Sequence, residues 1–195
     1  NSFWELVAMG QQFGLPTRLL DWTYSPLVAA HFATEDIDYY DRDGVIWCVN
    51  IEDVNANLPP SLRQKLSEQR ADIFTRDILE DVAHNFTSLQ ALSDQPFALF
   101  FEPASTVNRI ANQYALFSAV SDPAVTLLDL PESECFVRLI ISKKAKLEIR
   151  DKLDYINISE RMIYPGLDGI CRWIARRYAP LGPRYNAEHA KEEQP

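Results

Sequence analysis

One short segment, residues 11–36, concentrates side chains that can hold a small anionic ligand. Arg18 supplies a cation, Asp21 a carboxylate and Trp22 a flat aromatic face. A guanidinium binds phosphate or carboxylate through paired hydrogen bonds, and an aromatic face can stack on a nicotinamide or adenine ring. Each residue also has a structural alternative. Arg18 can clamp the loop through Asp21 or a backbone carbonyl, Asp21 can tie the loop, and Trp22 can belong to the core.

The hydroxyls of Thr23 and Ser25 come just before a predicted helix at 26–34. Ser25 and Pro26 are typical of a helix start, where the serine oxygen accepts from an unpaired backbone amide. Capping therefore explains Ser25 without any ligand, whereas Thr23 is freer to face one. The N-terminus of this helix favours an anion, whichever side chains point toward it.

A second group of polar side chains lies at residues 109–117. Arg109 and Gln113 share one face of this segment whether it is a helix or a strand, because a spacing of four residues fits both. One interpretation is a polar seam over an apolar core. The other is a ligand site, in which the Gln113 amide recognises a ribose or the edge of a base and Arg109 also contacts the ligand.

Other chemistries have less support. His31, His84 and His189 show no metal-ligand spacing, and we expect His31 to be a hydrogen-bonded core residue. The motifs GxxxxGK[ST], GxGxxG and GxSxG do not occur, so P-loop, dinucleotide-fold and hydrolase-elbow sites are not indicated. The acidic residues between 35 and 43 predict a solvated loop, with a divalent-metal site as the alternative. We therefore expect no bound metal.

Composition and charge narrow the class of protein. The chain has 195 residues, of which 47% are hydrophobic and 24% charged, which suits one globular domain. Its formal net charge of -9 is poorly suited to duplex nucleic acid, which binds clustered lysine and arginine. No apolar run reaches membrane-spanning length, so we expect no membrane partner. Cysteines without a CxxC pair suit a cytoplasmic location.

Hydrophobic periodicity and turn residues predict an α+β fold, with a mixed central β-sheet and flanking helices. We expect a single domain at residues 1–185, with a helical insert at 58–94 and a flexible tail at 186–195. Strands are expected at 18–20, 45–49, 97–101, 116–120 and 136–142, and helices at 2–12, 26–34, 59–69, 72–84, 144–155 and 168–178.

Three of these elements carry more specific expectations. We expect 45–49 to be a central strand of the sheet. The helix at 26–34 is apolar on nearly all sides, which predicts burial against the sheet. The helix at 168–178 is predicted to turn Ile170, Trp173, Ile174 and Tyr178 inward.

The sequence GLPTRLLDWTYSPLVAAHFA at 14–33 resembles the signature of the FRG domain family. The resemblance continues at 43–47 (DGVIW), at 109–117 and at 164–169 (YPGLDG), so it extends over most of the chain. Two departures stand out. The Phe/Tyr-Arg-Gly motif that names the family is absent, and we expect it to lie upstream of this sequence. The histidine that often precedes the aromatic residue of the first motif is replaced by Gln12.

The order of motifs is also similar to that of ADP-ribosyltransferases, which implies an ADP-ribosyltransferase-like fold. On this similarity Thr23 and Ser25 fall in a Ser-Thr-Ser-like region, and Gln113 falls at the late catalytic position, where those enzymes have a glutamate. The implied function is binding or processing of NAD or a related nucleotide by a transferase or glycohydrolase, in a toxin or phage-defence setting that includes a protein target. Because Gln113 is uncharged, the alternative is a nucleotide-sensing or protein-interaction domain without turnover. The candidate catalytic residues are Gln113 and Thr23, and the candidate ligand-binding residues are Arg18, Asp21, Trp22, Ser25 and Arg109.

Overall fold

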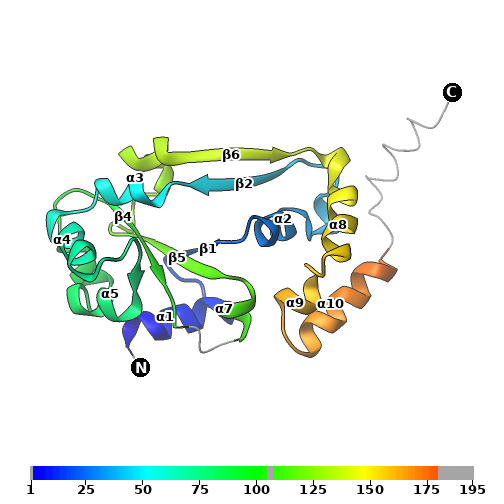
Figure 1. The fold of residues 1–195 in the computed structure, drawn as a ribbon, viewed down its shortest axis with the longest axis horizontal. Coiled ribbons are helices and arrows are strands. Elements are labelled where there is room, and N and C mark those ends of the chain that lie inside the picture. The colour runs from blue at the N-terminus through cyan, green and yellow to red at the C-terminus, as the bar shows by residue number, and fades with distance from the viewer. Residues whose placement is uncertain (1, 105–107, 180–195) are drawn as a thin grey trace. The chain divides into compact units, whose positions relative to one another are not determined.

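The computed structural model describes residues 2–104 and 108–179, and their contacts divide the chain into two compact units. The first unit consists of residues 1–24 and 48–137, and the second of residues 25–47 and 138–195. Helices and strands are interspersed along the chain (Figure 1), which confirms the predicted α+β class. The single domain predicted for residues 1–185 stays a prediction, and the tail predicted at 186–195 lies outside the described residues.

A mixed four-stranded sheet forms the centre of the first unit, in the order β1-β5-β4-β3. Its strands are β1 (Leu19–Thr23), β5 (Ala115–Val120), β4 (Ala98–Glu102) and β3 (Phe74–Thr75). β1 and β4 both run antiparallel to β5, whereas β3 runs parallel to β4. The predicted mixed sheet is therefore confirmed. The short β3 interrupts the segment predicted to be wholly helical and joins that segment to the edge of the sheet.

Both faces of this sheet pack against a hydrophobic core. On one face Leu19, Leu99 and Phe117 pack with Trp4 of α1 (Phe3–Gln12). On the other face Phe100, Leu116 and Trp22 pack with α3 (Ile51–Ala56). Figure 1 shows α1 and α3 on opposite sides of the sheet. Apolar runs such as 97–101 follow from this arrangement, because alternate residues of a strand face opposite cores. The remaining helices of this unit are α4 (Pro60–Gln69), α5 (Arg76–Val82), α6 (Phe86–Gln90), α7 (Asn108–Asn112), η2 (Leu127–Asp129) and η3 (Pro131–Cys135).

The second unit is mainly helical. Its helices are α2 (Pro26–Thr34), η1 (Ile37–Tyr39), η4 (Lys143–Ala145), α8 (Lys146–Tyr155), α9 (Glu160–Ile163) and α10 (Leu167–Tyr178). The strands β2 (Gly44–Val49) and β6 (Phe136–Ile141) form a separate two-stranded sheet. The prediction of a central strand at 45–49 is therefore wrong. Val45 and Trp47 are 42% and 39% exposed, because β2 lies in a narrow ribbon rather than between two covered strands.

Charged side chains fill part of the interior of the second unit. His31 and Arg150 are 0% and 1% exposed. NH1 of Arg150 donates to Nδ1 of His31 over 2.8 Å, and because arginine cannot accept, Nδ1 must be the nitrogen without a proton. Nε2–H of His31 then donates to Oε2 of Glu35 over 3.2 Å. The predicted hydrogen-bonded core histidine is confirmed.

Arg176 of α10 extends this buried network. It donates to both carboxylate oxygens of Asp154 over 2.8 Å and makes a short hydrogen bond to Glu160. Burial disfavours the charged forms of Arg176 and Glu160, but their hydrogen bonds outweigh it. The pKa of Arg176 is therefore raised and that of Glu160 is lowered. These ion pairs hold the guanidinium of Arg176 inward.

The predicted orientations of α10 and α2 are both wrong. In α10, Ile170, Ile174 and Tyr178 are 43%, 44% and 84% exposed, Trp173 is half-buried, and Gly169 is buried. In α2, Leu27 and Phe32 are 44% and 40% exposed, so this helix is not buried on all sides. Hydropathy alone cannot show that paired charges will occupy the inner face of a helix, because it treats each charge as unpaired.

Gly169→Ala is expected to destabilise the protein, although alanine is the better helix former. A Cβ at position 169 would overlap the carbonyl oxygens of Tyr164 and Glu160, and overpacking of this kind costs about 1–3 kcal/mol. The matched control is Gly10→Ala in α1, where the nearest atoms belong to the flexible side chain of Leu15. Urea unfolding followed by circular dichroism should give a lower midpoint for the first variant alone. Equal midpoints for the two variants would contradict this packing.

Candidate functional site

Arg18 clamps two backbone carbonyls in the first unit. Its NH2 donates to the carbonyl oxygens of Val120 and Ser121, each over 2.9 Å, and its guanidinium lies 4.4 Å from the ring centroid of Phe86. Burial lowers the pKa of Arg18, and the charge of Asp122 partly offsets this effect. The sequence allowed Arg18 to bind either Asp21 or a backbone carbonyl, and the structure shows that it binds backbone carbonyls.

Asp21 and Thr17 hold the side chain of Gln11, the penultimate residue of α1. Nε2 of Gln11 donates to Oδ2 of Asp21 over 2.9 Å, and Oγ1 of Thr17 donates to Oε1 of Gln11 over 2.6 Å. Within the intervening loop Gly14 has a φ of 87°, a conformation that favours glycine. These contacts tie the end of α1 to β1, which accounts for much of the polar content of the sequence motif.

Trp22 lies on the opposite face of β1 from Thr23. Its Nε1 donates to Oγ of Ser118 over 2.8 Å, and its ring meets that of Phe100 edge to face, with 5.3 Å between centroids. Arg18 and Thr23 are separated by the length of β1, roughly 16 Å for an extended strand. The predicted site residues therefore do not all converge on one place.

Thr23, Arg109 and Gln113 do come together where β1 ends. Oγ1 of Thr23 donates to the backbone carbonyl of Gln113 over 2.7 Å, and NH1 of Arg109 donates to the carbonyl of Gln12 over 3.0 Å. Gln12 and Gln113 are 5% and 7% exposed. We call Gln12, Thr23, Arg109 and Gln113 the motif cluster. This placement is compatible with both predictions for 109–117, which were a polar seam over an apolar core and a ligand site.

Exposed aromatic side chains accompany the motif cluster. Phe13, Tyr24 and Tyr114 are 79%, 50% and 58% exposed, and each directly follows a cluster residue in the sequence. The backbone N–H of Tyr24 donates to the carbonyl of Tyr114 over 3.1 Å. Tyr114 has a φ of 48°, a left-handed conformation that bulky residues rarely adopt and that recurs at functional sites. Exposed aromatic rings offer a surface on which a base can stack.

Glu102, at the end of β4, is a carboxylate that the sequence analysis did not single out. The hydroxyl of Tyr24 donates to Oε1 of Glu102 over 2.7 Å. Burial, together with this hydrogen bond, raises the pKa of Tyr24, so the phenol remains a donor to the carboxylate. A signal was available in the sequence, because Glu102 is the first charged residue after the apolar strand at 97–101.

Ser25, which belongs to the second unit, caps α2 as predicted. Its Oγ accepts from the backbone N–H of Val28 over 3.3 Å, and Pro26 occupies the first helical position of α2. Among residues 2–104 and 108–179, no three His, Cys, Asp or Glu side chains are grouped to hold a metal ion. In the same part of the chain, every helix is too short or too polar to cross a bilayer.

Arg18→Met is expected to lower the free energy of unfolding by about 1–2 kcal/mol, because two partly buried carbonyl groups lose a charged donor. Urea unfolding measures this loss, and Arg63→Met on the exposed face of α4 serves as the control. If Arg18→Met leaves stability at the level of the control, the structural role given to Arg18 is wrong.

Comparisons with curated proteins and with solved structures found no match. A comparison with family models did find one, over the segment that carries α1, β1, α2 and η1. Residues 1–42 match the model of the FRG domain, the family whose signature the sequence motif at 14–33 resembles.

Proposed function

We propose that this chain binds NAD or a related nucleotide at the motif cluster and processes it as an ADP-ribosyltransferase or glycohydrolase. The observation that carries the proposal is the set of exposed aromatic residues, each placed directly after a polar residue of the cluster. Such a surface suits a ligand that combines a flat base with a polar ribose. Modification of a protein target, in a toxin or phage-defence setting, belongs to the same proposal.

Binding would use groups at the end of β1. A nucleobase stacks on the ring of Tyr114 or Phe13, since stacking requires an aromatic face in contact with solvent. The hydroxyl of Thr23 gives its proton to the Gln113 carbonyl, and its oxygen can accept from a ribose hydroxyl. Arg109 brings a positive charge to the same place, which suits the phosphates of a dinucleotide.

Cleavage of the bond between nicotinamide and ribose leaves positive charge on the ribose. A carboxylate near that charge stabilises the transition state, whereas the neutral amide of Gln113 does so poorly. We assign this role to Glu102, whose carboxylate is exposed and is oriented by the hydroxyl of Tyr24.

The second candidate function is nucleotide sensing without turnover. The observation in its favour is Gln113 itself, which is uncharged and only 7% exposed at the position where ADP-ribosyltransferases have a glutamate. This alternative uses the same binding groups and assigns no chemical step to Glu102.

Tyr114→Ala is expected to weaken NAD binding roughly tenfold, the effect of losing one base–aromatic stack. Isothermal titration calorimetry on the full chain measures the affinity. Tyr155→Ala is the matched control, because Tyr155 is an 88% exposed tyrosine of α8. If the full chain shows no affinity for NAD or ADP-ribose, both candidate functions fail.

Glu102→Gln is expected to slow nicotinamide release from NAD about a hundredfold or more, as loss of a group that stabilises transition-state charge does. The affinity for NAD should change little, because the substitution preserves shape. Glu68→Gln, at an exposed position of α4, should leave the rate unchanged. Binding without any nicotinamide release by the unmodified chain would select the sensing function.

A further inference from the structure

The outward side of α10 is apolar, whereas the apolar side of a surface helix ordinarily faces the core. Leu167 and Tyr178, at the two ends of the helix, are 79% and 84% exposed. Ile170 and Ile174 between them are 43% and 44% exposed. Because these residues recur at intervals of three and four, they lie along one side of the helix. We call Leu167, Ile170, Ile174 and Tyr178 the α10 stripe.

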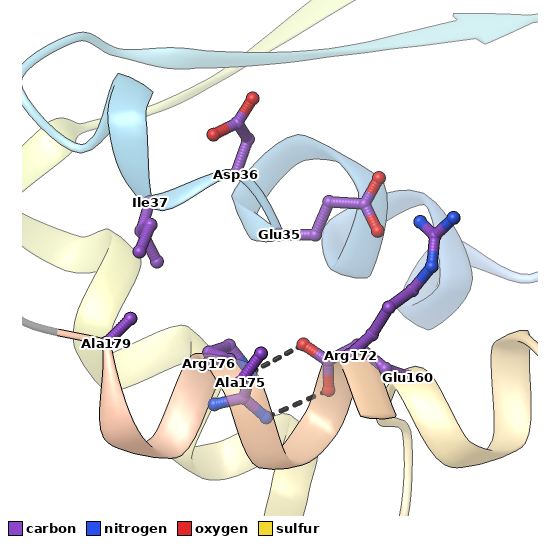
Figure 2. A pocket seen from close by; sticks show the side chains of 8 residues that line it. All are labelled: Glu35, Asp36, Ile37, Glu160, Arg172, Ala175, Arg176 and Ala179. Carbon is purple, nitrogen blue, oxygen red and sulfur yellow. Dashed lines mark hydrogen bonds and ion pairs between the residues drawn. The ribbon is translucent and has the colours of Figure 1, made fainter. Parts of the chain in front are cut away.

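The inner side of the same helix is occupied by contacts within the second unit. Gly169 is buried, and Arg176 is paired with Asp154 and Glu160. Figure 2 shows Arg172 and Arg176 of α10 among the residues around a pocket on this inner side. The α10 stripe is therefore left without a partner in the unit, since the polar side of the helix is the one that packs.

Two exposed arginines lie together beside the α10 stripe. The guanidinium carbons of Arg161 in α9 and Arg177 in α10 lie 4.1 and 4.3 Å from the centroid of the Trp173 ring. Arg177 follows Ile174 by three positions, so the two side chains are neighbours on the helix surface. Within the described residues neither arginine forms an ion pair with a carboxylate. The stripe is therefore bordered by two positive charges that no nearby acid neutralises.

The acidic excess of the chain lies outside the second unit. Of the 19 Lys and Arg and 28 Asp and Glu residues, 13 of each kind fall at 25–47 and 138–195. The other 6 basic and 15 acidic residues, at 1–24 and 48–137, account for the whole formal net charge of -9. The second unit therefore carries no net charge that would oppose the approach of an anionic surface.

We propose that the α10 stripe binds the surface of an anionic membrane, with the helix lying along the bilayer. The apolar side chains enter the boundary between headgroups and acyl chains, and Arg161 and Arg177 bind lipid phosphates. Trp173 and Tyr178 carry the amphipathic rings that favour this depth. A single convex helix face suits a fluid lipid surface, whereas a protein partner would have to supply a matching groove.

Such binding requires no membrane-spanning helix. The expectation of no membrane partner rested on the absence of an apolar run of spanning length, whereas an interfacial helix needs only one apolar side. The 12 residues of α10 extend over about 18 Å, which is enough for a helix that lies along the surface. The α10 stripe shares no residue with the motif cluster, so the proposal does not depend on the nucleotide function.

Flotation of the full chain with lipid vesicles tests the proposal. One preparation contains equal parts of phosphatidylcholine and phosphatidylglycerol, which is anionic, and the other contains phosphatidylcholine alone. We expect the chain to float with the anionic vesicles and not with the neutral ones. Added sodium chloride should weaken the binding, because it screens the attraction between the arginines and the lipid phosphates.

The double variant Ile170→Gln, Ile174→Gln should bind the anionic vesicles roughly tenfold more weakly or less, because apolar surface no longer leaves water. Glutamine is a good helix former, so α10 should persist. Leu6→Gln combined with Leu128→Gln is the matched control, since both leucines are exposed in the first unit. Thermal unfolding of each variant shows whether the fold is retained.

The double variant Arg161→Gln, Arg177→Gln should bind the anionic vesicles roughly twentyfold more weakly, the effect of losing two cations near an anionic surface. Arg42→Gln combined with Arg63→Gln makes the same change in net charge at exposed positions away from α10 and should bind as the unmodified chain does.

The proposal is overturned if the unmodified chain floats with neither kind of vesicle or with both equally. It is also overturned if the isoleucine variant or the arginine variant binds as well as its control. Sedimentation velocity on the same proteins identifies the other occupant of the stripe. A dimer that the isoleucine variant abolishes, with no vesicle binding, would make the stripe a protein interface and the membrane proposal wrong.

Discussion

The antiparallel pairing of β1 with β5 is the contact on which the first unit depends. It runs from Leu19 opposite Ala119 to Thr23 opposite Ala115, so it joins segments that lie far apart in the sequence. Because alternate residues of a strand face opposite sides, this register sends Trp22 to Ser118 on one face and Thr23 toward Gln113 on the other. A slip of one residue would exchange the two faces.

This pairing gives the polar residues of the motif two different tasks. Arg18 and Asp21 hold the loop and α1 in place, through backbone carbonyls and through Gln11. Thr23 and Gln113 instead meet at the end of the strands, beside exposed aromatic rings. The second unit relies on a comparable constraint, since the buried guanidinium of Arg150 requires the acceptors that His31 and Glu160 supply and so fixes the packing around it.

Local signals were sufficient to predict many elements of the fold. Ser25 and Pro26 mark the start of α2, and the apolar runs at 97–101 and 116–120 mark β4 and β5, because caps and hydrophobic runs act within a few residues. Partners distant in the sequence were not predictable. The carbonyls bound by Arg18, the inward position of Arg176 and the pairing of Tyr24 with Glu102 all depend on which segments meet in the folded chain.

A crystal structure of the full chain grown with ADP-ribose tests the central claim most directly. The account predicts the adenine ring against Tyr114 or Phe13, with a ribose hydroxyl within hydrogen-bonding distance of Oγ1 of Thr23. Ligand density elsewhere, with the end of β1 empty, would contradict it.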